Sequence, residues 1–233
     1  MAAPETLAPA AELAQKGSKS FPNESPDYRN ARTKLLAEEI ELRRHIRRVA
    51  ALRRELPPGG QAKDYRFRDE NGRELGLADL FGRHNTLFTY IWMYGPERER
   101  PCPMCTSFLG SMDIPAVDIE QRLAMAIIGR SSVARQLAFA RNRGWRNLKF
   151  YQCIGDEFAK DYRALVDGEE WAAVLVWKRE GEKVRLFWAA EGGPETADPG
   201  FDPSLAPDPT PLWTVLDWTP GGRGTTWYPK LEY

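Results

Sequence analysis

The sequence predicts an α/β protein in which helices flank a mixed β-sheet, with a helical extension at the N-terminus. Apolar, strand-like segments at 85–94, 123–128 and 148–153 are separated by segments that favour helix or turn. Two further strands, at 171–178 and 184–188, flank a short turn. Alternating strands and helices are typical of a sheet with parallel strands, and a closing hairpin adds antiparallel ones. With 233 residues, 42% of them hydrophobic, the chain can bury a core around such a sheet.

The N-terminal part divides into two segments of different character. Residues 1–26 contain four prolines and few large apolar side chains, which predicts an extended leader without a fold of its own. Residues 28–55 instead carry apolar side chains at helical spacing, among them Leu35, Leu42, Ile46, Val49 and Leu52. This pattern predicts one long amphipathic helix that ends before the turn at 57–60. We therefore expect a leader at 1–26, a helix and linker at 27–60, the sheet domain at 61–224 and a tail at 225–233.

The elements of the sheet domain follow from local signals. Residues 64–77 predict a hairpin around Asn71-Gly72, followed by a short helical turn at 77–81. The dense aromatic and β-branched run at 85–94 predicts a buried central strand. After the strand at 123–128, Ser131 or Ser132 can cap a helix that Gly144 ends. Residues 191–211, rich in Pro, Gly and Asp, predict an irregular excursion.

Composition argues against several functional classes. Lys plus Arg and Asp plus Glu each total 33, so no excess charge draws the chain to nucleic acid. The longest apolar runs are shorter than the roughly 20 residues that span a bilayer, and the N-terminus lacks the pattern of a signal peptide. We expect a cytoplasmic protein without a membrane or nucleic-acid partner. No glycine-rich phosphate loop is present in the sequence, so we expect no nucleotide cofactor.

The helix at 28–55 is locally basic, which allows either a nucleic-acid or membrane role or a solvated helix face. Arginines at 43, 44, 47, 48, 53 and 54 outnumber the acidic residues at 38, 39 and 41. We interpret the charges as a solvated face, whose opposite apolar stripe packs on the domain or on a second subunit. The sequence thus allows a homodimer.

The motif that carries chemistry is Cys102-Pro103-Met104-Cys105, which follows the central strand and opens a helix. A helix N-terminus presents free N–H groups and positive partial charge, which stabilise a thiolate. Pro103 suits the first helical position because its missing N–H has no helical partner there. Residues three apart share a helix face, so Cys105 can resolve a mixed disulfide formed at Cys102. The pattern predicts thiol–disulfide exchange with a thiol or disulfide substrate, which can be a protein.

Three alternatives were weighed against this interpretation. A Cys-x-x-Cys can be half of a zinc site, but only Cys153, His45, His84 or carboxylates remain to complete the ligands, so we expect no metal. Cys153 lies in a predicted strand and is expected to be inert core. A peroxiredoxin-like thiol peroxidase is the stronger rival, although Glu99 stands where a peroxiredoxin usually has Thr or Ser, three residues before the cysteine. The third alternative is a non-enzymatic interaction protein with a vestigial motif.

Motifs outside the cysteine pair point to a family. They are the segments at 31–39, 63–67, 77–81, 93–96, 144–145 and 216–220. Together with the Cys102 to Cys105 pair, they make the chain, over most of residues 28–220, resemble a bacterial family catalogued as domain of unknown function 899. That family is regarded as thioredoxin-like and is labelled a predicted dithiol-disulfide oxidoreductase. The resemblance implies a thioredoxin-like domain with redox-active Cys102 and Cys105. Where thioredoxins have a cis-proline before the strand that faces the dithiol, this chain has Glu170-Trp171.

Overall fold

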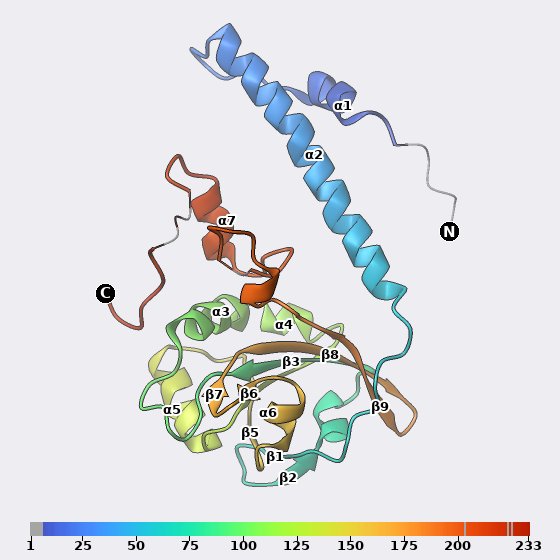
Figure 1. Ribbon diagram of the computed structural model, residues 1–233, viewed down its shortest axis with the longest axis vertical. Helices are drawn as coiled ribbons and strands as arrows, with labels where there is room; N and C mark the ends of the chain where they lie inside the picture. The colour runs from blue at the N-terminus through green and yellow to red at the C-terminus, as the bar shows by residue number, and fades with distance from the viewer. Residues whose placement is uncertain (1–6, 203, 223, 225) are drawn as a thin grey trace. The chain divides into compact units, whose positions relative to one another are not determined.

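A computed structural model describes residues 7–202, 204–222, 224 and 226–233 of the chain. It divides the protein into two compact units, Met1–Leu56 and Pro57–Tyr233 (Figure 1). The first unit is helical, and the second contains the β-sheet and the cysteines. The units are described separately below.

The first unit consists of α1 (Ala10–Gly17) and α2 (Pro26–Arg54). The N–H of Tyr28 donates to the Ser25 side chain, which caps α2, and Pro26 stands in its first turn. The predicted long helix is thus observed, whereas the predicted extended conformation of the leader is wrong for residues 10–17. That segment, Ala-Ala-Glu-Leu-Ala-Gln-Lys-Gly, consists largely of strong helix formers, and Ala14 packs in a small core with Ile40 of α2.

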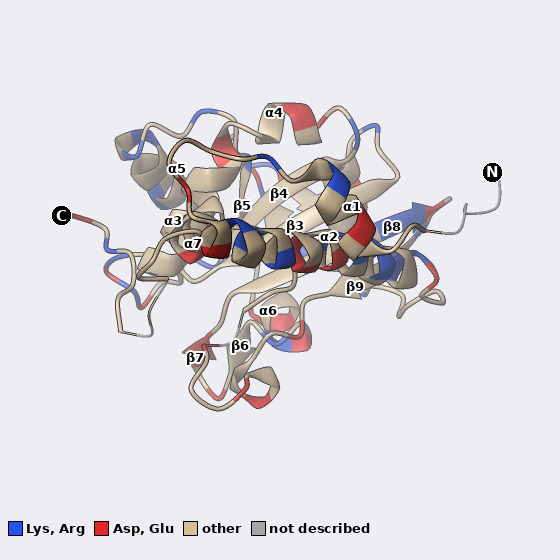
Figure 2. Cartoon of the chain, turned by 90° about the horizontal axis from the view of Figure 1, so that it is seen from above, with Lys and Arg blue, Asp and Glu red and all other residues tan. Residues whose placement is uncertain are grey.

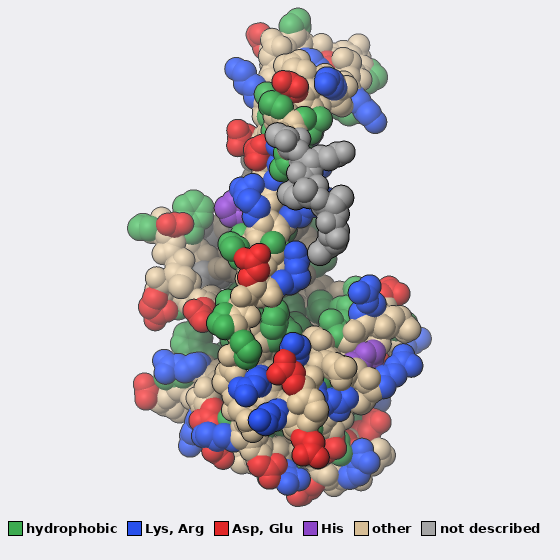
Figure 3. All heavy atoms as spheres, turned by 90° about the vertical axis from the view of Figure 1, so that its right-hand side faces the viewer, with side chains coloured by type: hydrophobic (Ala, Val, Ile, Leu, Met, Phe, Trp, Pro, Cys, Tyr) green, Lys and Arg blue, Asp and Glu red, His purple; other side chains and the backbone are tan. Residues whose placement is uncertain are grey.

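The surface of α2 mixes both signs of charge, as the blue and red positions along it show in Figure 2. Leucines 35, 42 and 52 remain exposed among these charges. Every helix among the described residues is too short or too polar to cross a bilayer. The visible face of the second unit likewise intersperses Lys and Arg with Asp and Glu (Figure 3).

The second unit is built on a seven-stranded mixed sheet with the order β2-β1-β5-β4-β3-β8-β9. Strands β3, β4 and β5 run parallel to one another. Strand β8 is antiparallel to β3, and β9 is antiparallel to β8. Strands β1 and β2 form an antiparallel hairpin. The α/β prediction is confirmed. The strands are β1 (Arg66–Arg68), β2 (Glu74–Gly76), β3 (Thr86–Trp92), β4 (Ala124–Gly129), β5 (Phe150–Cys153), β8 (Ala173–Glu180) and β9 (Lys183–Ala189).

Shorter elements connect these strands. A 3-10 helix η1 occupies the predicted turn, and α5 begins after Ser132, whose side chain accepts from the Arg135 N–H. The sequence did not predict α4, α6, β6, β7, η2 or α7, which are too short to show a period. The bounds are η1 (Leu77–Phe81), α3 (Pro103–Asp113), α4 (Ala116–Ile119), α5 (Val133–Asn142), α6 (Glu157–Asp161), β6 (Leu165–Val166), β7 (Glu169–Glu170), η2 (Pro194–Thr196) and α7 (Pro211–Asp217).

Alternation along β3 separates two hydrophobic cores, one on each face of the sheet. Leu87 and Ile91 point into one core, which we call the Cys153 core because that cysteine lies in it. Tyr90 and Trp92 point into the other, which includes Cys105 and which we call the dithiol core. Because α3 contributes Phe108 and Leu109 to the dithiol core, the cysteine motif is anchored on this face of the sheet.

Candidate functional site

The cysteine pair lies where α3 begins. Cys102 is the N-cap residue of α3 and Pro103 its first helical residue, as the sequence predicts. The Cys102 N–H donates to the Met93 carbonyl at 3.1 Å. Both the N–H and the hydroxyl of Thr106 donate to the Cys102 carbonyl, at 3.0 and 2.9 Å. These bonds fix the Cys102 backbone between the end of β3 and the first turn of the helix.

The two sulfurs of the motif are unequal. Cys102 is half-buried, whereas Cys105 is only 2% exposed. The hydrogen bond from the Cys105 thiol, together with the Cys105 and Met104 amides and the charge of Arg98, lowers the pKa of Cys102 to about 6 against the opposing effect of burial. The Cys102 side chain makes no capping hydrogen bond of standard geometry, so the amides act as nearby dipoles. The same thiol contact and burial raise the pKa of Cys105 well above its ordinary value.

Tyr90 and Met93 hold the buried sulfur from the strand side. The Tyr90 hydroxyl and the Met93 backbone both form hydrogen bonds with the Cys105 sulfur, and each favours its thiolate. The Tyr90 ring stacks on Phe108 of α3, with centroids 4.6 Å apart. Burial raises the pKa of the Tyr90 hydroxyl, which therefore stays protonated and can donate. We did not predict Tyr90 as a site residue, although its position in the alternation of β3 places it on the face that the cysteine helix must cover.

Glu170 ties down the loop between β3 and Cys102. Its carboxylate, 9% exposed, accepts from the Gly95 N–H at 3.1 Å and from Arg98 Nε at 2.8 Å. Its other oxygen accepts from Arg130 Nη1 at 3.0 Å, and Arg130 also pairs with Asp156. A buried carboxylate between two guanidinium groups is strongly held. Glu170 therefore fixes Arg98 at the point where its charge favours the Cys102 thiolate.

Arg135 of α5 holds the same loop from another side. Its guanidinium lies over the Tyr94 ring, 4.5 Å from the centroid. It donates to the carbonyls of loop residues 95, 96, 98 and 99. Of the two arginines in this loop, Arg98 lowers the pKa of Cys102, whereas Arg100 pairs with Glu232. Neither Glu170 nor Arg135 was predicted, since both are distant from the motif in sequence.

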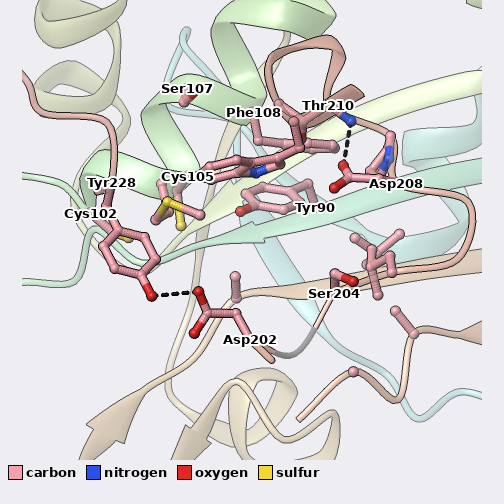
Figure 4. A pocket seen from close by; sticks show the side chains of 18 of the residues that line it. Tyr90, Cys102, Cys105, Ser107, Phe108, Asp202, Ser204, Asp208, Thr210 and Tyr228 are labelled. Atoms are coloured by element: carbon pink, nitrogen blue, oxygen red, sulfur yellow. Dashed lines mark hydrogen bonds between the residues drawn. The ribbon is translucent and has the colours of Figure 1, made fainter. Parts of the chain in front are cut away.

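A cavity of about 430 Å³ opens beside the dithiol (Figure 4). Cys102, Cys105, Tyr90 and Phe108 line one side of it. Described residues between 190 and 228 line the other side, among them the apolar and aromatic residues Leu205, Trp213 and Tyr228. The sequence predicted residues 191–211 of this wall only as an irregular excursion, because their Pro-, Gly- and Asp-rich composition has no period that indicates a helix or strand.

Two carboxylates belong to this cavity. The Tyr228 hydroxyl donates to Asp202 at 2.5 Å, and the Thr210 N–H donates to Asp208 at 2.8 Å (Figure 4). Apart from Cys102, whose pKa is lowered, Asp202 and Asp208 are the charged side chains among the described residues that line the cavity. The peptide bonds before β8 are trans within the described chain, and Ala172 lines the cavity there. The chain therefore has no cis-proline before β8, at the place where thioredoxins have one.

The other residues considered from the sequence lie apart from this site. Cys153 lies in the opposite core, where burial raises its pKa to about 12. Among the described residues, which include His45 and His84, no three His, Cys, Asp or Glu side chains converge as metal ligands. Trp92 and Trp145 pack in the aromatic core behind α3, not in the cavity.

A dithiol between a central parallel strand and a helix N-terminus, with an antiparallel hairpin on the other side of that strand, defines a thioredoxin-like protein. Residues 18–233 match the family model described as "Bacterial protein of unknown function (DUF899)". The chain therefore belongs to this family, which confirms the resemblance seen in the sequence. A search of curated proteins found no match.

Solved structures show low-identity similarity. The exposed lipoprotein thioredoxin Etrx1 of Streptococcus pneumoniae is 14% identical, with 56% of this chain and 90% of that chain covered and a TM-score of 0.41. A peroxiredoxin-like protein of Aquifex aeolicus is 14% identical, with coverages of 58% and 75% and a TM-score of 0.43. The reduced 2-Cys peroxiredoxin of Plasmodium vivax is 13% identical, with coverages of 68% and 93% and a TM-score of 0.43.

Proposed function

We propose that the protein is a thiol–disulfide oxidoreductase of the cytoplasm in which Cys102 is the attacking thiolate and Cys105 the resolving thiol. The observation that carries the proposal is the inequality of the two sulfurs. Cys102 reaches the cavity with its pKa lowered to about 6, while Cys105 is buried with its pKa raised. Cys102 is thus a thiolate at neutral pH, and Cys105 stays protonated until it resolves the mixed disulfide.

The reaction requires no group beyond the two cysteines and a disulfide substrate. The Cys102 thiolate attacks one sulfur of the substrate RS–SR, forms a mixed disulfide and releases RS⁻. The Cys105 thiol then gives its proton to the released RS⁻, and its sulfur attacks the Cys102 sulfur, which releases the second RS⁻. The substrate gains two electrons, and the protein is left with a Cys102–Cys105 disulfide. The Tyr90 hydroxyl, which favours the Cys105 thiolate, assists the second step.

Trapping tests the assignment of the two roles. Cys105→Ser should accumulate a mixed disulfide at Cys102 with a cellular thiol or with oxidised glutathione, because the resolving sulfur is gone. Cys102→Ser should trap far less, since Cys105 is buried and protonated. Cys153→Ser is the matched control and should behave as wild type. Mass spectrometry counts the adducts, and their absence from both single mutants would refute the exchange mechanism.

A redox titration separates this proposal from its rivals. In defined thiol–disulfide buffers, a reversible two-electron couple confined to Cys102 and Cys105 supports the oxidoreductase. Peroxide consumption with sulfenic acid at one cysteine would favour a peroxidase instead. This chain lacks the hydroxyl that a peroxiredoxin usually carries three residues before its cysteine. Glu99 occupies that position, and its carbonyl accepts from Arg135. Thiols that react with neither disulfide nor peroxide would favour a non-enzymatic interaction protein.

We also propose that the protein forms a homodimer and has no nucleic-acid partner. The interspersed charges of both units give no support to nucleic-acid binding (Figures 2 and 3). The exposed leucines along α2 support the expectation of a homodimer. Light scattering on the purified full-length chain tests it, and a monomer at all concentrations would contradict it.

A further inference from the structure

The cavity beside the dithiol has the size and lining of a small-molecule site. Its volume of about 430 Å³ lies within the range of roughly 300–1,000 Å³ typical of ligand pockets. Phe108 and Tyr90 form a stacked aromatic wall beside the sulfurs. Trp213 and Tyr228 line the cavity from the C-terminal segment, with ring centroids 6.5 Å apart. Such a lining favours a substrate with an apolar or aromatic body.

The same C-terminal wall bears on protein substrates. An extended protein segment needs an open surface with backbone groups to pair with. Here residues between 190 and 228 lie across the cavity from the dithiol, and Leu205 and Trp213 contribute side chains to the lining. The trans peptides before β8 also do not reproduce the docking proline of thioredoxins. The enclosure is therefore better suited to a compact molecule than to a polypeptide strand.

The charge of the cavity lining indicates which charge the substrate carries. Besides the Cys102 thiolate, the charged side chains among the described lining residues are Asp202 and Asp208. Each has one carboxylate oxygen oriented by a hydrogen bond, from the Tyr228 hydroxyl and the Thr210 N–H respectively. Carboxylates fixed at a partly enclosed site attract cations and repel anions. A substrate with an ammonium group is favoured over one with a carboxylate.

We propose that the dithiol acts on a low-molecular-weight disulfide with an apolar body and a cationic group, held in this cavity between the cysteines and Asp202 and Asp208. The proposal rests on the oxidoreductase function proposed above. Cys102 attacks the disulfide, one amino-thiol leaves, and Cys105 releases the second, so that one RS–SR becomes two thiols as the protein dithiol becomes a disulfide. A dithiol reductant of the cell restores the protein by the reverse exchange.

Three disulfides of similar length test the proposal: cystamine, bis(2-hydroxyethyl) disulfide and 3,3′-dithiodipropionate. They are dicationic, neutral and dianionic, respectively. The rate of oxidation of the reduced full-length protein is followed by intrinsic fluorescence or by quenched mass spectrometry. Each rate is divided by that of a free reference thiol with the same disulfide, which removes differences in leaving-group reactivity. We expect cystamine to exceed the dianion by about tenfold after this correction.

Variants assign the effect to the cavity. Asp202→Asn with Asp208→Asn should remove most of the preference for cystamine over the dianionic disulfide. Asp118→Asn, at an exposed position of α4 outside the lining, is the matched control and should keep the preference. The disulfides of insulin should react more slowly than cystamine at equal concentration.

The outcomes separate this inference from the function on which it rests. Equal corrected rates for the three disulfides, a preference that survives in the double variant, or faster reaction with insulin would overturn the inference and leave the oxidoreductase intact. If the reduced wild-type protein reacts with none of the disulfides, the proposed function fails and this inference fails with it.

Discussion

The two faces of the sheet each hold a buried cysteine, and their surroundings give opposite chemistry to the thiols nearby. On one face, Cys153 lies within a strand among apolar side chains, and burial raises its pKa to about 12. On the other, Cys105 is as deeply buried, but it donates to Cys102, whose pKa is lowered to about 6. We expect Cys102 rather than Cys153 to be the nucleophile, because Cys102 stands at a helix start beside a hydrogen-bond donor and a cavity.

Alkylation is the strongest test of this contrast. At pH 7 the two pKa values imply thiolate fractions of about nine-tenths for Cys102 and about 10⁻⁵ for Cys153. The lower intrinsic nucleophilicity of a low-pKa thiolate offsets roughly 10³ of this ratio. We expect Cys102 to react with iodoacetamide at least about 100-fold faster than Cys153. The Cys102 rate should rise with pH around a midpoint near 6. Quantitative mass spectrometry measures both rates, and comparable labelling would break the contrast.

Stability gives the second test. Cys153→Ser puts a hydroxyl into an apolar core and should lower the free energy of unfolding by about 1–3 kcal/mol. Cys102→Ser at pH 5.5 should change it much less, because Cys102 is half-buried and is mostly protonated there in both states. Urea titration of the reduced proteins compares them. A larger loss for Cys102→Ser at this pH would contradict the assignment of Cys153 to the tighter environment.

The pH dependence of that difference has a definite sign. The pKa of Cys102 is about 6 in the folded protein, below its ordinary value of 9.0. The folded state therefore gains stability from the thiolate as pH rises from 6 toward 9, and loses it as pH falls through 6. The free energy of unfolding of wild type should therefore rise relative to that of Cys102→Ser between pH 6 and pH 9.

Tyr90→Phe tests the strand-side support of the resolving sulfur. Loss of the hydroxyl removes a hydrogen bond that favours the Cys105 thiolate, so resolution of the mixed disulfide should slow by about three- to tenfold. Formation of the mixed disulfide should change little. Tyr65→Phe is the matched control, since the Tyr65 hydroxyl donates to Asp161 on the opposite face. Rapid-quench mass spectrometry follows the two steps, and equal slowing in both variants would indicate a general structural effect.

Arg98→Gln is expected to have the smallest effect. Its charge is the weakest of the influences described above that lower the Cys102 pKa, so alkylation at pH 6 should slow by about two- to threefold. Arg100→Gln removes an equal charge from the same loop, but Arg100 pairs with Glu232. That control should keep the wild-type rate. A loss of the same size in both variants would show that net charge, not the placement of Arg98, sets the pKa.

The sequence predicted well where a signal is local. The strand at 85–94, the helix at 28–55 and the cap position of Cys102 depend on neighbouring residues, and all three are observed. Glu170 and Arg135 act on the cysteine loop across more than 30 residues of chain, so no spacing reveals them. The C-terminal wall of the cavity is set by tertiary packing of a segment without periodicity. The helix at 10–17 was missed because flanking prolines outweighed its helix-forming composition.

The hydrogen bond between the two sulfurs also sets how many protons accompany the electrons. Above pH 6, reduction of the disulfide yields one thiolate at Cys102 and one thiol at Cys105, whose pKa is raised. Two electrons then enter with a single proton, and the reduction potential should fall by about 30 mV per pH unit. Below pH 6 both sulfurs take up protons, and the slope should double to about 59 mV. Acidification thus makes the disulfide a stronger oxidant, and it does so more steeply below pH 6 than above it.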